Sequence, residues 1–237
     1  TQQAKLQEEK RLTNKCKFIF NKTETNKGFY KMPEPNEGDV FYDIEGFPQA
    51  DQRPFEYLHG IYFFNGKEFE FKDFTVKDFT KAEEEKIFKK LIEFLEKHFD
   101  KYPKAYLYHY NDYEKRALRE LASDYSATFI KGNNFVDKLL RLEKFVDLYR
   151  VVSQCMQTSE KDLSLKSIEK FYRDERSADI KTADDSIRLF ESWLTTKNDK
   201  NLKDVIAYNE EDCMSTYDLR EFLIKNRPKN FPFFKLS

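Results

Sequence analysis

Cysteine is scarce in this chain, and the three cysteines lie too far apart to form a site. Cys16, Cys155 and Cys213 are odd in number and lack the paired spacing of a zinc site or a disulfide framework. A reducing compartment is therefore expected, and we predict a cytoplasmic protein. Apolar runs of membrane-spanning length and a signal-peptide pattern are also missing, so no membrane partner is predicted.

A surplus of charge of either sign is missing as well. The chain has 42 Lys and Arg against 43 Asp and Glu, which gives a formal net charge of -1. A protein that coats duplex nucleic acid is expected to be basic, so any contact with nucleic acid should be local. Hydrophobic residues nevertheless make up 39% of the chain and aromatic residues 16%, which excludes a disordered chain and suffices for one good core.

The first 37 residues differ in composition from the rest of the chain. Residues 2–15 are polar and helix-prone, and residues 32–38 form a linker punctuated by proline and glycine. We interpret residues 1–37 as a linker or the tail of a preceding domain, and residues 38–237 as one domain in which order begins at Asp39. Because the chain starts with threonine and not methionine, we expect a piece of a longer protein.

Hydrophobic periodicity predicts the remaining elements. Apolar or alternating runs between turn residues predict strands at residues 40–44, 55–64, 68–74, 105–109 and 145–148. The second and third of these flank Asn65-Gly66, the strongest short-range hairpin signal. Helical spacing predicts helices at residues 80–98, 113–125, 135–142, 163–172, 185–195 and 202–224. This order predicts an α/β fold with a mixed sheet of about five strands, the first of them central, flanked by helices.

Two acidic residues interrupt the first predicted strand. Asp43 and Glu45 lie in the otherwise apolar segment 40–46, and both point to one face because side chains alternate along a strand. Burying two like charges side by side is costly unless cations compensate them. The simplest explanation is a site for Mg²⁺ or Mn²⁺. Asp-x-Glu alone is a weak signal, and exposed acids on an edge strand are the alternative.

The last predicted helix carries a tyrosine and an aspartate on its packing face. Residues at helical spacing form this face: Val205, Tyr208, Asp212, Thr216, Leu219 and Leu223. If the face packs on the sheet, Asp212 joins the two strand carboxylates, and three buried carboxylates require one or two cations. Tyr208 lies one turn before Asp212 and would reach the same site, an ordinary core aromatic being the alternative.

A third acidic element lies at residues 108–118, where a predicted strand passes into a helix. Asp112 suits the N-cap of that helix, which leaves Glu114 in the first turn as the better ligand. A solvated acid that complements the helix dipole is the alternative for Glu114. Asp112 and Asp147 are predicted to hold the metal ligands in place without binding the metal themselves. For Asp147, the alternative is a core residue whose hydrogen bonds are satisfied within the protein.

These motifs resemble the DEDD exonucleases of the tyrosine subtype, which have a ribonuclease H-like fold. Asp-Ile-Glu at residues 43–45 and Tyr-x-x-x-Asp at residues 208–212 carry the resemblance. The second motif of that family usually ends in Phe-Asp, where this chain has Tyr113-Glu114. A narrower resemblance, to the YprB-type ribonuclease H-like domain of RecB-like nucleases, includes the Tyr-Glu pair. It covers residues 32–226 and rests on segments 33–46, 108–115, 145–152, 165–172 and 207–213.

The resemblance implies a function and a site. It implies a 3′–5′ exonuclease on single-stranded DNA or RNA, with DNA favoured, that uses two divalent cations, Mg²⁺ or Mn²⁺. The implied ligands are Asp43, Glu45, Glu114 and Asp212, and Tyr208 would orient or deprotonate the attacking water. RecB-like nuclease and helicase domains are implied in the same chain or a partner chain. A catalytically silent module that grips nucleic acid and an endonuclease of the ribonuclease H type are the alternatives.

Overall fold

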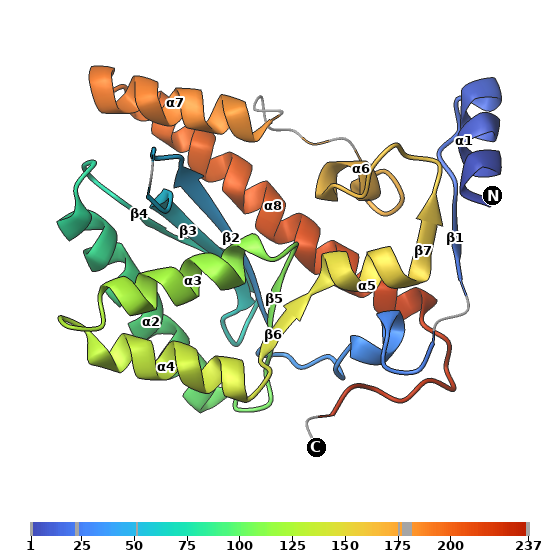
Figure 1. The fold of residues 1–237 in the computed structure, drawn as a ribbon, viewed down its shortest axis with the longest axis horizontal. Coiled ribbons are helices and arrows are strands. Elements are labelled where there is room, and N and C mark those ends of the chain that lie inside the picture. Colours follow the sequence, from blue (N-terminus) through green and yellow to red (C-terminus); the bar gives the residue numbers. More distant parts are fainter. Residues whose placement is uncertain (1, 22–23, 51, 175, 177–181, 236–237) are drawn as a thin grey trace.

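A mixed sheet of five strands lies among the helices of one half of the molecule (Figure 1). The computed structural model describes residues 2–21, 24–50, 52–174, 176 and 182–235. The sheet has the order β4-β3-β2-β5-β6, built from β2 Val40–Phe47, β3 Phe55–Phe64, β4 Phe69–Thr75, β5 Leu107–His109 and β6 Phe145–Asp147. The predicted α/β class, the mixed sheet and the central place of the first predicted strand are confirmed.

The sheet is antiparallel on one side of β2 and parallel on the other. β3 runs antiparallel to β2 and continues into β4 through the predicted hairpin at Asn65-Gly66. Gly66 has a φ of 107°, which a residue with a side chain adopts only under strain. β5 runs parallel to β2, and β6 parallel to β5. The carboxyl ends of these three strands therefore meet at one edge, where open α/β sheets bind their ligands.

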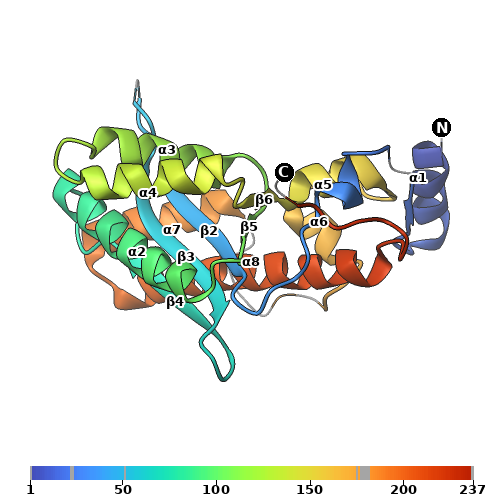
Figure 2. The same ribbon diagram turned by 90° about the horizontal axis from the view of Figure 1, so that it is seen from below.

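Helices cover both faces of the sheet (Figure 2). One face carries α2 (Lys81–Lys101), α3 (Tyr113–Asp124) and α4 (Ile130–Arg141), and the other carries α7 (Ala183–Thr196) and α8 (Asp199–Asn226). The main hydrophobic core lies between these layers and includes Tyr42, Tyr57, Leu58, Phe88, Leu91 and Phe190. Among the described residues, no helix is both long and apolar enough to cross a membrane.

A second, smaller core surrounds the C-terminal half of α8. The elements around it are β1 (Phe18–Phe20) paired with β7 (Met156–Thr158), η1 (Gly28–Lys31), α5 (Leu148–Cys155) and α6 (Leu165–Glu169), with α1 (Gln2–Thr13) against β7. Phe29 and Met32 are only 1% and 0% exposed. The prediction that order begins at Asp39 is therefore wrong, because apolar residues before it fill this core. The assignment of residues 1–37 to a linker or a preceding domain stays a prediction.

Candidate metal centre

Strand β2 presents two carboxylates to the face of the sheet that α8 covers. In the pairing of β2 with β3, Asp43 lies opposite Gly60 and Glu45 opposite Leu58, so both acids point to the same face. A glycine is required opposite Asp43, because a Cβ on Gly60 would lie 1.7 Å from the Oδ1 of Asn209. The bare backbone of β3 thus lets α8 approach the two acids closely.

Helix α8 supplies the third carboxylate and the residue that holds Asp43. Asp212 and Tyr208 are buried on the face of α8 that packs on β2 and β3, as predicted. Asn209 is buried beside them, and its Nδ2 donates a hydrogen bond to Asp43 Oδ2 across 2.6 Å. The helix therefore both adds a charge to the site and fixes the orientation of a strand carboxylate.

Asp43, Glu45 and Asp212 converge on one point. One carboxylate oxygen from each lies within 4.8 Å of the other two. Burial raises the pKa of Asp43 well above its ordinary value, and the charges of Asp212 and Glu45 raise it further. Burial also raises the pKa of Asp212, and that of Glu45 to about 8. A divalent cation would stabilise the charged form of all three, because hard oxygen atoms are the ligands that Mg²⁺ and Mn²⁺ prefer.

Glu114 stands beside this group. It lies in the first turn of α3 and is 4% exposed, with its Oε2 3.4 Å from His109 Nδ1. That oxygen has no hydrogen-bond partner among the described residues. The charge of Glu114 also raises the pKa of Asp43. Glu114 is thus near enough to act on Asp43 and has a buried oxygen left for another ligand, and its role as a metal ligand stays a prediction.

Asp112 and Asp147 follow neighbouring strands of the sheet edge. Asp112 occupies the N-cap position of α3, as predicted, but its side chain makes no capping hydrogen bond. The backbone of Asp112 is itself helical, with φ -91° and ψ -5°, whereas a residue whose side chain caps a helix is normally extended. Asp147 accepts the N–H groups of Asn111 at 3.0 Å and Arg150 at 3.3 Å. Asp147 therefore fixes the loop before Glu114, and the support of both acids for the metal ligands stays a prediction.

Tyr208 lines the same cavity as the carboxylates and is held by a lysine. The cavity has a volume of about 350 Å³ and includes Asp43, Asp212 and Lys166. Lys166 Nζ, on α6, donates to the Tyr208 hydroxyl oxygen across 2.8 Å and lies 4.3 Å from the ring centroid. Burial raises the pKa of Tyr208, and Asp212 raises it further, so the hydroxyl stays protonated. Its proton can therefore be donated to a third group.

The comparisons with known proteins agree with this fold. A family model described as RNase_H superfamily matches residues 40–224, which is most of the chain. The chain belongs to the RNase_H superfamily. Members of this superfamily are generally nucleases that bind nucleic acid and use divalent metals, and the three-carboxylate group lies within the matched range. No curated protein and no solved structure matches the chain.

In this RNase_H-superfamily chain, two further residues, Arg176 and Ser186, contact carboxylates of the centre. Arg176 Nη2 lies 2.6 Å from Asp212 Oδ1 and 2.7 Å from Glu169 Oε1. Ser186 Oγ, on α7, donates to Glu45 Oε2 across 3.0 Å. The carboxylate oxygens of Asp43, Glu45 and Asp212 suit a divalent cation. Such a cation would either share Asp212 with Arg176 or displace Arg176 from it. Both contacts were missed by sequence reasoning, because each joins residues far apart in the chain and neither has a local pattern.

Proposed function

We propose that this chain is a metal-dependent 3′–5′ exonuclease of the tyrosine DEDD type that acts on single-stranded nucleic acid, with DNA preferred. The observation that carries the proposal is the convergence of Asp43, Glu45 and Asp212 beside Tyr208. In the sequence, these residues form the Asp-Ile-Glu motif at residues 43–45 and the Tyr-x-x-x-Asp motif at residues 208–212. Glu114, at the second motif, lies beside this group, and its Oε2 has no hydrogen-bond partner among the described residues.

Each residue has a distinct role in the proposed reaction. Two divalent cations, held by Asp43, Glu45 and Asp212 with Glu114 as a further ligand, would supply a nucleophilic hydroxide and stabilise the leaving oxygen. Asn209 holds Asp43 in place by its 2.6 Å hydrogen bond. Tyr208, Lys166 and Arg176 are the groups that would act on the substrate.

Tyr208 orients a reactant by donating a hydrogen bond. Its oxygen already accepts from Lys166, and its raised pKa disfavours a role as the base that deprotonates water. The O–H group is therefore best suited to donate to an oxygen of the water or of the scissile phosphate. Lys166 and Arg176, which both lie beside the Tyr208 ring, bring positive charge to the place where a phosphate would enter.

Hydrolysis of end-labelled single strands tests the proposed activity. A 5′-labelled DNA oligonucleotide should give a ladder that shortens from the 3′ end, only with Mn²⁺ or Mg²⁺ present. A blocked 3′ terminus should abolish the ladder, and a circular single strand should stay intact. Cleavage of the circle would instead indicate an endonuclease of the ribonuclease H type. A matched RNA oligonucleotide measures the sugar preference, and no metal-dependent product from either strand refutes a nuclease.

A catalytically silent module is the second candidate, and one contact favours it. Arg176 already compensates Asp212, so the carboxylate group has an internal cation and does not depend wholly on a metal. The Glu at the second motif, in place of the more usual Asp, points the same way. Such a module would bind single strands and leave them intact in Mn²⁺. Binding without hydrolysis would therefore select this candidate.

We also propose that this chain works next to other nuclease and helicase domains. The motif resemblance over residues 32–226 supports RecB-like nuclease and helicase domains, in this protein or in a partner chain. Residues 1–37 would then be the linker or the tail of the preceding domain. The intact mass of the native protein tests the first possibility, because additional domains would make it far heavier than these 237 residues. Purification of the native complex tests the second.

A further inference from the structure

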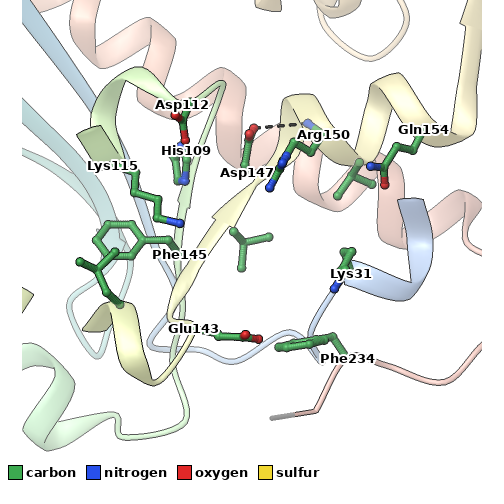
Figure 3. Close-up of a pocket in the computed structure, with 13 residues that line it drawn as sticks. Lys31, His109, Asp112, Lys115, Glu143, Phe145, Asp147, Arg150, Gln154 and Phe234 are labelled. Atoms are coloured by element: carbon green, nitrogen blue, oxygen red, sulfur yellow. Dashed lines mark hydrogen bonds between the residues drawn. The ribbon is translucent and has the colours of Figure 1, made fainter. Parts of the chain in front are cut away.

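A second cavity opens at the free edge of strand β6 (Figure 3). Its volume is about 320 Å³, which is in the range of cavities that hold small ligands. Three cationic side chains from different elements line it: Lys115 from α3, Arg150 from α5 and Lys31 from η1. Figure 3 shows their ends turned toward the same space. Like charges gathered in this way repel one another unless an anion lies between them.

The three cations share the cavity with three acids, Asp112, Glu143 and Asp147. Within the described part of the chain, Lys31, Lys115 and Arg150 nevertheless make no ion pair. Asp147 Oδ1 accepts two backbone N–H groups, and Figure 3 shows Glu143 on the side of the cavity where Lys31 and Phe234 lie. The cationic ends are therefore left for an external anion with several oxygen atoms, such as a phosphate.

The rest of the lining suits a nucleoside. The rings of Phe145 and Phe234 line the cavity, and Lys31 Nζ lies 5.5 Å from the centroid of Phe234. His109 also lines it, is 1% exposed and has no hydrogen-bond partner for its Nε2 among the described residues. Cations that hold the backbone, with aromatic rings on which bases stack, are the combination by which proteins bind single strands.

His109 joins this cavity to the metal centre. Its Nδ1 lies 2.6 Å from the carbonyl oxygen of Asn111 and 3.4 Å from Glu114 Oε2. Glu114 in turn acts on the charge of Asp43. The cavity therefore adjoins the Glu114 side of the centre, where a strand with one phosphate at the carboxylates can place another of its nucleotides.

We propose that this cavity binds one phosphate-bearing nucleotide unit of a single strand, its phosphate on Lys115, Arg150 and Lys31 and its base or sugar on the Phe234 ring. The position relative to the scissile phosphate rests on the proposed function, whereas the binding of the nucleotide does not. The subsite gives local affinity to a chain whose net charge of -1 provides no general attraction for nucleic acid.

Binding measured without catalysis tests this subsite. Fluorescence anisotropy of a labelled oligothymidylate in EDTA compares the wild type with Lys115→Gln/Arg150→Gln. The double variant should bind about tenfold or more weakly, because two charge-assisted hydrogen bonds are lost. Its plot of log affinity against log salt should be flatter by about 0.7 for each lost phosphate contact. The matched control is Lys67→Gln/Lys200→Gln, which removes the same charge from exposed positions outside the cavity and should bind like the wild type.

Competition identifies the ligand class. Thymidine 5′-monophosphate should displace the oligothymidylate from the wild type at lower concentration than inorganic phosphate does. Equal potency of the two competitors overturns the assignment of a nucleotide, and equal binding by the cavity variant and the control variant overturns the subsite. The failure of the proposed nuclease function can be distinguished from the failure of the subsite. In the first case, strands would stay intact in Mn²⁺ while the wild type still bound them more tightly than the cavity variant.

Discussion

The hydroxyl of Tyr208 accepts a hydrogen bond from Lys166 while its own proton remains available to the site. We predict that Tyr208→Phe loses about 10²-fold in hydrolysis rate, because it removes this donor and keeps the ring. The melting temperature and the Mn²⁺ affinity should stay close to those of the wild type. Single-turnover hydrolysis of a saturating single strand measures the effect.

A second tyrosine provides the control for this variant. Tyr217 is also on α8 but packs against Phe41 and Phe69 in the second core. Tyr217→Phe should therefore hydrolyse the strand at the wild-type rate. If Tyr208→Phe is equally fast, Tyr208 is an ordinary core aromatic and the assignment to the tyrosine subtype loses its main support.

The carboxyl group of Glu45 makes the metal-free protein sensitive to pH. Burial raises its folded-state pKa to about 8, so the folded state keeps a proton that the unfolded chain releases near its ordinary pKa. This contribution to stability is fully present below the ordinary pKa and is lost as the pH rises through about 8. The melting temperature of wild type in EDTA should therefore fall, relative to that of Glu45→Gln, between pH 5 and pH 8.5.

The comparison with Glu45→Gln removes the titration of Glu45 together with its effect on the pKa of Asp43. Burial also raises the pKa of Glu56 to about 8 and lowers that of His59 to about 3, and both groups are present in the two proteins. Mn²⁺ should reduce the difference in melting temperature between the two proteins. The reduction should be largest at high pH and smallest at low pH, because the metal binds the deprotonated form. A difference in melting temperature that does not change with pH would show that Glu45 is not buried as described.

At the site, the sequence indicated residues whose type conflicts with their position. Asp43 and Glu45 were visible as charges in an apolar strand, and Asp212 as a charge on an apolar helix face. Asn209 and Arg176 were not, because a buried amide beside an acid, or an arginine in a polar loop, is unremarkable until the distant partner is known. The hydrogen bond of Lys166 to Tyr208 has no sequence signal either, because it joins residues that are 42 positions apart.

At the level of elements, the approach of α8 to β3 depends on the missing side chain of Gly60. Gly60→Ala places a Cβ 1.7 Å from Asn209 Oδ1 and 2.8 Å from a ring carbon of Phe71, so the Asn209 side chain or the helix must shift. We predict a loss of about 1–3 kcal/mol in unfolding free energy, as for other overpacked sites. Hydrolysis should also fall, because Asn209 no longer holds Asp43. Denaturant unfolding and the hydrolysis assay measure the two effects.

A second substitution separates crowding from positioning. Asn209→Ala removes the group with which the new Cβ collides, so the double variant Gly60→Ala/Asn209→Ala should regain stability relative to Gly60→Ala. Its activity should remain low, because Asp43 has still lost its donor. Wild-type stability and activity in Gly60→Ala alone would show that α8 does not need this close approach.

Arg176 links α6 to α8 through Glu169 and Asp212, and it competes with any cation that binds Asp212. We predict that Arg176→Gln lowers the melting temperature in EDTA and raises the Mn²⁺ affinity about tenfold, since an opposite charge at this distance shifts a carboxylate equilibrium by that order. Calorimetric titration with Mn²⁺ measures the affinity.

The neighbouring Arg173 is the matched control. It pairs with Glu169, Glu211 and Asp218, and among the described residues it forms no ion pair with Asp212, so Arg173→Gln should keep the wild-type Mn²⁺ affinity. A weaker affinity in Arg176→Gln than in this control would mean that Arg176 assists metal binding, and the competition between the two cations would be refuted.

Elements with strong local signals were predictable, and elements that depend on a distant partner were not. The hairpin at Asn65-Gly66 and the amphipathic α2 appeared near their predicted bounds. By contrast, α5 was not expected, because Val151 and Val152 favour a strand on propensity, whereas the cap formed by Asp147 and burial against the second core select a helix. β1 and β7 are three residues each and exist only as a pair.

For the whole molecule, α8 connects the two cores and gives the site its setting. Its N-terminal half packs on the sheet with Tyr208, and its C-terminal half carries Leu219 and Leu223 into the second core. Composition predicted one core but not that residues before Asp39 would join a second. Because the net charge is only -1, affinity for a single strand must come from local groups, for which we propose the metal centre and the cavity beside it.

The rate of nucleotide release from a 5′-labelled single strand, measured across a Mn²⁺ series, tests the metal centre most directly. Wild type should show a rate that saturates with Mn²⁺, and Asp43→Asn should show none while remaining folded and at least as stable in EDTA, since the substitution relieves like-charge repulsion. The exposed Asp73→Asn on β4 is the control and should match the wild type. Full Mn²⁺-dependent activity in Asp43→Asn would contradict a metal centre at Asp43, Glu45 and Asp212.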